Sequence, residues 1–139
     1  MAYDFQVTVD CAHPHDLADW WAEALGWSVE PSDEAFIRRM VAEGQATEED
    51  TTTHRGVLVW RLGIGIRHPE SGRRILFQRV PEPKTVKNRV HLDVYVGEQR
   101  EAEAARLVGM GAKELFRGQQ GPYKWITLAD PEGNELCLQ

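Results

Sequence analysis

The two halves of the sequence repeat one pattern of residues. Phe5–Asp10 alternates apolar and polar residues, and an amphipathic stretch that ends at Gly26 follows it. Such alternation is typical of a half-buried strand, and the apolar stripe after it has helical spacing. In the second half Arg89–Val96 alternates in the same way, and a helix over about Glu98–Met110 would end before Gly111, 85 residues after Gly26. The shared order predicts two copies of one strand–helix–strands unit.

Further strands complete each copy. The segment at about 31–55 has no counterpart in the second half, and we interpret it as an insertion with a short helix capped by Ser32 and a turn at Thr47–Asp50. A turn with Pro and Gly at Asp130–Asn134 joins the last two strands. The sequence predicts these strands at Trp27–Glu30, Gly56–Leu62, Ile64–Arg67, Arg74–Val80, Lys113–Arg117, Trp125–Ala129 and Glu135–Gln139.

These elements predict a single domain over residues 1–139. The first module covers about 3–80 and contains the insertion, the linker with two prolines covers 81–87, and the second module covers about 88–139. A chain of this length can bury a hydrophobic core without disulfides or metals as staples.

The composition excludes several classes of partner. The formal charge is −6 with no long basic run, which argues against nucleic acid or an anionic membrane as the partner. No stretch approaches the roughly 20 apolar residues of a membrane span, and no leader pattern is present. We therefore expect a cytoplasmic protein. Cys11 and Cys137 lie in strand-like surroundings without CxxC spacing, so we expect buried, reduced thiols.

Strand parity gathers polar side chains on one face of each repeat, because successive side chains in a strand point to opposite faces. A sheet with one face in water would show the same alternation. We favour a ligand-binding hollow, because the repeat gives two related polar faces within one small domain. The residues on these faces are Gln6, Thr8, Asp10, His91, Asp93, Tyr95, Glu135, Cys137 and Gln139.

Four motifs together carry a family resemblance. They are Gln6–Asp10, Ala24–Trp27, Val90–Val94 and Leu128–Cys137. In order and spacing they resemble the vicinal oxygen chelate superfamily of glyoxalases, bleomycin resistance proteins and extradiol dioxygenases, most closely its glyoxalase-like domain branch. The resemblance implies an α+β fold in which two βαβββ modules form a curled mixed sheet around a cup, with the helices outside. It also implies a homodimer.

The resemblance further implies four metal-ligand positions, one on the first and one on the last strand of each module. Carried onto this chain, they are Gln6, His91, Cys137 and either Leu76 or Gln78, of which we favour Gln78 as the polar one. Amides and a single thiol are poor ligands for an oxygen-preferring cation. We therefore expect no metal. The alternative is a divalent metal held by Gln6, Gln78, His91 and Glu135.

Aromatic residues of the strands are candidates for the walls of the cup, although core packing is the commoner role. Arg61, Arg67 and Arg79 would suit an anionic ligand, but we interpret them as paired surface residues. His13 and His15 at the start of the first helix resemble a solvated cap. The wall candidates are Trp60, Phe77, Tyr123 and Trp125, with Phe36 and Met40 of the insertion as a lid.

The function that we expect from the sequence is binding of a small organic molecule in the cup without a metal. The alternative is a lyase, isomerase or dioxygenase-like enzyme with His91 as acid or base. The sequence does not name the ligand. The residues expected at the ligand are Gln6, Thr8, Asp10, Trp60, Gln78, Asp93, Tyr95, Trp125, Glu135 and Cys137.

Overall fold

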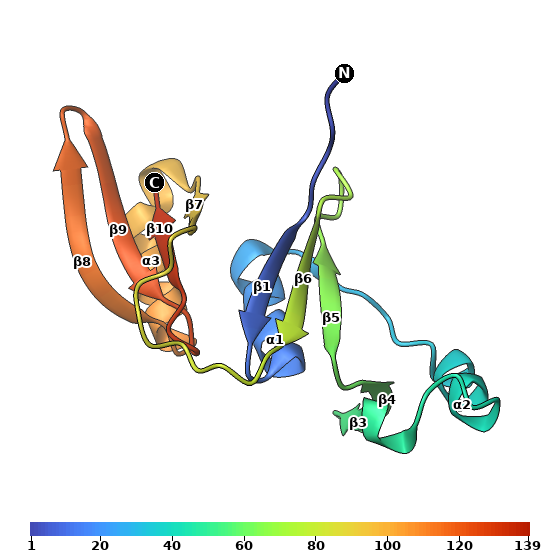
Figure 1. Ribbon diagram of the computed structural model, residues 1–139. Coiled ribbons are helices and arrows are strands. Elements are labelled where there is room, and N and C mark those ends of the chain that lie inside the picture. Colours follow the sequence, from blue (N-terminus) through green and yellow to red (C-terminus); the bar gives the residue numbers. More distant parts are fainter. The chain divides into compact units, whose positions relative to one another are not determined.

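Each half of the chain builds its own four-stranded mixed sheet in the computed structural model, which describes residues 1–139 (Figure 1). The chain divides into two compact units, Met1–Pro83 and Lys84–Gln139. The two units are described separately below.

The main sheet of the first unit has four strands, and one helix covers it. Its strand order is β1-β6-β5-β2, in which β1 runs parallel to β6 and the other pairs are antiparallel. The elements are β1 (Val7–Cys11), α1 (Pro14–Leu25), β2 (Ser28–Val29), β5 (Gly63–Arg67) and β6 (Arg74–Arg79).

The second unit repeats this topology. Its strand order is β7-β10-β9-β8, with β7 parallel to β10 and the other pairs antiparallel. The predicted α+β fold with two βαβββ modules is therefore confirmed. The elements are β7 (Leu92–Val94), the short 3-10 helix η2 (Gly97–Gln99), α3 (Arg100–Gly109), β8 (Lys113–Gln120), β9 (Tyr123–Ala129) and β10 (Glu135–Leu138).

Four elements of the first unit have no counterpart in the second. They are α2 (Glu34–Ala42), the 3-10 helix η1 (Glu48–Asp50), β3 (Thr51–His54) and β4 (Val57–Trp60). The strand expected at Gly56–Leu62 is shorter, and it pairs with β3 in a hairpin of its own instead of joining the main sheet. Figure 1 shows this hairpin just before the start of β5, on the side where α2 lies.

The helix α1 buries one face of the first sheet. Leu17 and Trp21 of the helix are buried, as are Ile75 and Phe77 of β6. Phe77 is 0% exposed, so its expected place in a pocket wall is wrong. Alternation along β6 explains this, since Phe77 lies on the helix side and its neighbours face the other way.

A buried carboxylate shapes the last turn of the second unit. Asp130 is 3% exposed and accepts hydrogen bonds from the backbone N–H groups of Glu132 and Asn134, both at 2.9 Å. In such Asx-type bonds the side chain accepts from backbone N–H groups of the turn, which have no partner in a neighbouring strand. The predicted hairpin turn at Asp130–Asn134 is confirmed, and β10 after it is buried along its whole length.

Several local boundaries differ from the prediction. The side chain of Asp33, not Ser32, caps α2 by accepting from the N–H of Phe36, while Ser32 donates to the carbonyl of Leu58. The strand β8 does not end at Arg117 but continues to Gln120. In this extension the indole of Trp125 lies directly over Gly118, where any Cβ would overlap the ring.

The insertion hairpin is fastened to α1 by histidines. His15 is 9% exposed, and its Nε2 lies 2.8 Å from the carbonyl of Trp60, to which it must donate. Its ring stacks on that of His54, whose Nε2 lies 2.7 Å from Asp19. The expectation that His15 is a solvated cap is therefore wrong, because the hairpin covers it.

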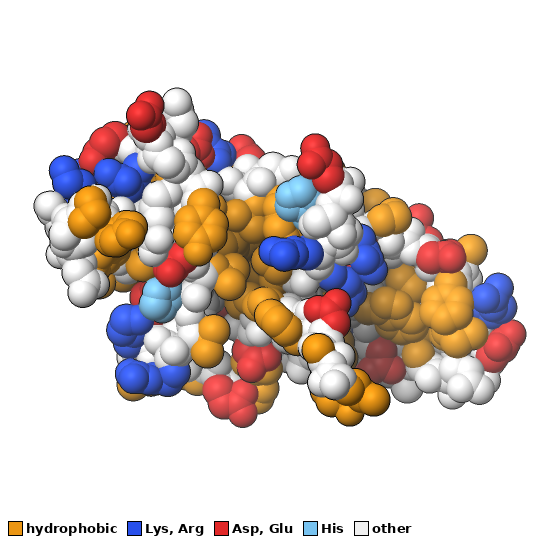
Figure 2. Space-filling model, turned by 90° about the horizontal axis from the view of Figure 1, so that it is seen from above, with side chains coloured by type: hydrophobic (Ala, Val, Ile, Leu, Met, Phe, Trp, Pro, Cys, Tyr) orange, Lys and Arg blue, Asp and Glu red, His pale blue; other side chains and the backbone are white.

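Side chains of different kinds are mixed on the surface of the protein that Figure 2 displays. Figure 2 shows acidic, basic and hydrophobic side chains interspersed on the face that it displays, with no continuous basic region. None of the helices combines the length and the hydrophobicity needed to cross a bilayer. Both cysteines are buried thiols outside any disulfide, as predicted.

Candidate functional site

The strand registers identify equivalent positions in the two units. In the first unit Thr8 pairs with Leu76, and in the second Asp93 pairs with Cys137. Thr8 and Asp93 are 85 residues apart, which is the offset of the sequence repeat, so they are equivalent positions in two sheets of the same topology. Their strand partners are therefore equivalent as well, and Leu76 is the counterpart of Cys137. The choice of Gln78 for that position is wrong, and Gln78 lies one step further along the same face.

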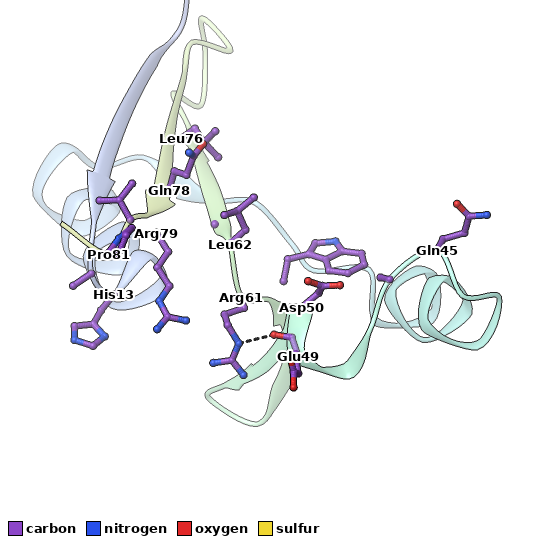
Figure 3. A pocket seen from close by; sticks show the side chains of 15 residues that line it. His13, Gln45, Glu49, Asp50, Arg61, Leu62, Leu76, Gln78, Arg79 and Pro81 are labelled. Atoms are coloured by element: carbon purple, nitrogen blue, oxygen red, sulfur yellow. Dashed lines mark hydrogen bonds between the residues drawn. The ribbon is translucent and has the colours of Figure 1, made fainter.

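The first unit contains a pocket of about 910 Å³ (Figure 3). Leu76 and Gln78 of β6 form one wall, and Trp60 and Leu62 from the end of β4 form another. Apolar walls with a few polar groups are typical of sites for small organic molecules. The pocket is lined by Ala12, His13, Gln45, Ala46, Glu49, Asp50, Trp60, Arg61, Leu62, Gly63, Leu76, Gln78, Arg79, Val80 and Pro81.

The insertion supplies part of this pocket, but not through the residues expected. Gln45 and Ala46, which follow α2, and Glu49 and Asp50 of η1 line it. The expected lid residues Phe36 and Met40 do not. The Phe36 ring instead packs edge-on against Trp60, with ring centroids 6.5 Å apart, and so supports the wall.

Glycines clear the pocket face of β5. Gly63 lies opposite Gln78 and Gly65 opposite Leu76, so β5 places no side chain beside them. The guanidinium of Arg74 and the carboxylate of Glu30 form an ion pair over Gly65, where a Cβ would overlap both. A Cβ at Gly63 would overlap the carbonyl oxygen of Phe77, so Gly63 allows β5 to approach β6 closely beside the pocket, and Gly65 leaves room for the ion pair.

The second unit contains a smaller pocket of about 310 Å³ on its polar sheet face. His91 and Asp93 come from the start of the unit, and Cys137 comes from the central strand β10. The Nε2 atom of His91 lies 3.3 Å from Oδ1 of Asp93. The pocket is lined by Lys87, His91, Asp93, Phe116, Trp125, Thr127, Glu135, Cys137 and Gln139.

Three possible ligand atoms converge in this smaller pocket. One ring nitrogen of His91, one carboxylate oxygen of Asp93 and the sulfur of Cys137 all lie within 4.8 Å of one another. The thiol also lies 3.2 Å from the hydroxyl of Thr127. Imidazole, carboxylate and thiolate are ligands that suit a borderline metal such as Zn²⁺.

Glu135 is occupied by other partners. It is 9% exposed, and its carboxylate accepts from the ammonium of Lys84 at 3.1 Å and from the N–H of Asn88 at 3.0 Å. Burial alone would raise the pKa of the Glu135 carboxyl. The net effect is a lowered pKa, because hydrogen bonds from Asn88 and from its own backbone, together with the contact with Lys84, stabilise the ionised form. Glu135 thus fixes the segment before β7, and Asp93 takes the place beside His91 and Cys137.

The structure distributes the expected ligand residues unevenly. Trp60 and Gln78 line the pocket of the first unit, and His91, Asp93, Trp125, Glu135 and Cys137 line that of the second. The sequence analysis did not predict that Leu62 and the residues after α2 line the pocket. Leu62 could have been predicted, because it is an apolar residue two positions after the wall candidate Trp60. Four expected residues line neither pocket, namely Gln6, Thr8, Asp10 and Tyr95.

The four ligand positions carried over from the resemblance do not suit an oxygen-preferring cation. Leu76 has no donor atom. The amide oxygen of Gln6 lies 3.3 Å from a guanidinium nitrogen of Arg74, a neighbour that would repel a metal ion. Only His91 and Cys137 remain, and neither supplies an oxygen.

The family follows from a match over nearly the whole chain. A family model described as a glyoxalase-like domain matches residues 6–139. The chain belongs to the glyoxalase-like domain family. This confirms the family inferred from the four sequence motifs. Comparison of this glyoxalase-like protein with curated sequences gives no match.

Solved structures share the fold of this glyoxalase-like protein at low identity. A mutant of the fosfomycin resistance protein FosX from Listeria monocytogenes, complexed with Mn(II) and 1S,2S-dihydroxypropylphosphonic acid, has a TM-score of 0.67 at 9% identity and covers 100% of this chain and 92% of its own. The bleomycin-binding protein from Streptomyces verticillus, complexed with copper(II)-bleomycin, has a TM-score of 0.53 at 13% identity, with coverage of 100% and 98%. A protein from Agrobacterium tumefaciens has a TM-score of 0.67 at 13% identity, with coverage of 99% and 96%.

Proposed function

We propose that this glyoxalase-like protein binds a small organic molecule, without a metal, in the pocket of its first unit. The observation that carries the proposal is the pocket of about 910 Å³ with Trp60, Leu62 and Leu76 in its walls. Its volume falls within the range of about 300–1,000 Å³ that is usual for ligand sites. A planar apolar group would lie against Trp60, and the amide of Gln78 would bond to a polar substituent.

The fold relatives are consistent with such a role. Two of them form complexes with small molecules, a phosphonic acid in FosX and bleomycin in the bleomycin-binding protein. Those ligands belong to those proteins. In this chain the walls of the large pocket support the proposal.

Calorimetry with a set of neutral mono- and bicyclic aromatic compounds, in the presence of a chelator, tests the proposal. Leu62 is 64% exposed, so Leu62→Asp should leave the fold intact while it replaces an apolar wall by a charge. We expect binding about tenfold weaker, because losing half of a leucine contact removes about 1.4 kcal/mol.

The matched control is Leu115→Asp in β8, at a leucine that is 41% exposed and lines neither pocket. It should bind the compounds as the parent protein does. Equal affinity in Leu62→Asp and Leu115→Asp, or no binding of any compound by the parent, would contradict the proposal.

The His91, Asp93 and Cys137 cluster favours a second candidate function. In this alternative the protein is an enzyme in which His91 moves a proton, Asp93 orients its ring, and a borderline divalent metal is held beside them. Titration with Co²⁺ tests for the metal, because a thiolate bound to cobalt gives a charge-transfer absorption. The band should disappear in Cys137→Ser and His91→Ala and persist in His68→Ala, whose histidine lies in the first unit.

Assembly as a homodimer remains a prediction from the family. Light scattering coupled to size-exclusion chromatography measures the mass directly. A mass near twice 15.8 kDa is expected, and a mass near 15.8 kDa would contradict it.

A further inference from the structure

A second cavity adjoins the large pocket of the first unit. It measures about 300 Å³ and lies between the start of α1 and the insertion hairpin. The two cavities share Ala12, His13, Arg61 and Arg79 among their lining residues, so they lie side by side. We call this smaller cavity the basic cleft. It is lined by Ala12, His13, Pro14, His15, Asp16, Thr52, Thr53, His54, Arg61 and Arg79.

The basic cleft carries an excess of positive and hydrogen-bonding groups. Two arginines and three histidines line it, against one carboxylate, that of Asp16, whose side chain is 78% exposed. Glu49 and Asp50 line the large pocket but not the basic cleft, and Asp50 accepts from the N–H and the hydroxyl of Thr47. A negatively charged group is therefore favoured at the cleft end of the combined cavity.

The two arginines at the junction are presented in different ways. Arg61 donates through Nε to the carbonyl of Glu49 and through Nη2 to that of Thr51, both at 2.8 Å, so its guanidinium is held in one position. The backbone N–H of Arg79 donates to the carbonyl of Leu62 at 2.7 Å, while its guanidinium makes no ion pair or hydrogen bond within the chain. Figure 3 shows both side chains extending toward the same side of the pocket, on which His13 also lies.

The walls of the basic cleft are already assembled. The bond from His15 to the carbonyl of Trp60 and the pair of His54 with Asp19 join α1 to the hairpin on either side of the stacked imidazoles. The site is therefore formed before a ligand binds, and binding carries little entropic cost for ordering its side chains. Guanidinium groups suit this task, because their planar arrangement of donors matches the oxygens of carboxylate and phosphate.

We propose that the basic cleft binds the oxyanion of a ligand whose apolar part occupies the large pocket, with Arg79 as the main contact. The ligand is then an amphiphilic acid, with a carboxylate or phosphate attached to a planar apolar body. This inference rests on the proposed function, which it makes more specific. It departs from the expectation that Arg79 is paired on the surface.

Compounds that share one ring system and differ in charge test this inference. Calorimetry at constant ionic strength would compare neutral 2-naphthol with 2-naphthoate and 2-naphthyl phosphate. We expect at least one anion to bind the parent protein about tenfold more tightly than 2-naphthol. Arg79→Gln should remove that advantage, measured as the ratio of the affinity for the anion to the affinity of the same variant for 2-naphthol.

The matched control is Arg73→Gln, at an exposed arginine between β5 and β6 that lines neither cavity. It removes the same charge and should keep the anion preference. If 2-naphthol binds but the anions have no advantage, or if their advantage survives Arg79→Gln, the inference is overturned while the proposed function stands.

Inorganic phosphate separates the two proposals when no naphthalene binds. In a ¹H–¹⁵N spectrum, phosphate at constant ionic strength should shift the amide resonances of Thr52, Thr53 and His54 in the parent protein. The shifts should be absent from Arg79→Gln and present in Arg73→Gln. This pattern would support an anion site even if the apolar pocket failed its own test, and an absence of shifts in the parent would overturn the inference.

Discussion

Replacing Glu135 by glutamine should loosen the start of the second unit. The carboxylate accepts from Lys84 at 3.1 Å and from the N–H of Asn88 at 3.0 Å, and the side chain of Asn88 continues to Asn134 at 2.8 Å. Residues 84–88 lie outside any helix or strand, so these bonds are what fastens them to β10. The substitution keeps the shape of the side chain and removes its charge.

The expected loss is about 2 kcal/mol in the free energy of unfolding. Hydrogen bonds to a charged group contribute about 1.5–3 kcal/mol each, and the Glu135 carboxylate accepts one from Lys84 and one from Asn88 in addition to that from its own backbone. Glutamine retains one acceptor oxygen, and Lys84, whose side chain is 23% exposed, recovers part of its hydration. For a chain of this size the loss corresponds to a fall of about 6 °C in Tm.

The pH dependence follows from the lowered pKa of Glu135. A carboxyl whose folded pKa is depressed stabilises the protein above its unfolded pKa of about 4.5, and this contribution is lost as the pH falls through the folded pKa. Urea denaturation at pH 7 should therefore show the full difference between the parent and Glu135→Gln. The difference should shrink as the pH is lowered below about 4.

Glu82→Gln is the matched control, because Glu82 is exposed, makes no bond of its own and lies two residues before Lys84. It should change the free energy of unfolding by less than about 0.5 kcal/mol. A Glu135→Gln variant as stable as Glu82→Gln at pH 7, or a difference from the parent that does not change with pH, would refute the reasoning.

Three further substitutions test local packing and capping. Gly118→Ala should destabilise by about 1–3 kcal/mol in urea denaturation, because the new Cβ would overlap the indole of Trp125. Asp33→Ala should cost about 1 kcal/mol and lower the helical circular dichroism, since it removes the cap of α2. Asp130→Ala should cost about 2–4 kcal/mol in the same denaturation assay, because the buried N–H groups of the last turn, Asn134 among them, lose their acceptor.

Each of these substitutions has a conservative comparison. Gly109→Ala, at a glycine in α3 with open space around it, should be neutral or stabilising by up to about 1 kcal/mol. Asp33→Asn keeps the capping oxygen and should match the parent within about 0.5 kcal/mol. Asp130→Asn keeps the acceptor for the backbone and should fall between parent and alanine. Equal losses in the alanine and asparagine variants would contradict the capping argument.

The fold was accessible from the sequence because its signals are local and occur twice. The alternation at Gln6–Asp10 and at His91–Val96, each followed by an amphipathic helix and a glycine, predicts the two modules. The turn at Asp130–Asn134 can also be predicted from the sequence, because it contains Pro and Gly. These features depend on neighbours in the chain, which a sequence displays directly.

The site was only partly accessible, because it depends on register and on contacts distant in the sequence. Parity gave the correct face for Gln78 and Cys137 but not their relative positions along the strands, which the pairing of β1 with β6 determines. The β3–β4 hairpin lies over His15 through a contact between residues 45 positions apart in the sequence. No local sequence pattern predicts such a distant contact. For the same reason Phe77 was assigned to a pocket although it lies in the core.

Only the first of the two units carries an insertion between its strands, and this affects how ligand preference can change. Much of the large pocket is built by Gln45–Leu62, a stretch that the second copy does not possess and whose hairpin shares no ladder with the main sheet. Its length and side chains can therefore be altered without shifting a single strand pairing of the scaffold. Grafting a different stretch between β2 and β5 is a direct route to a glyoxalase-like protein with new selectivity.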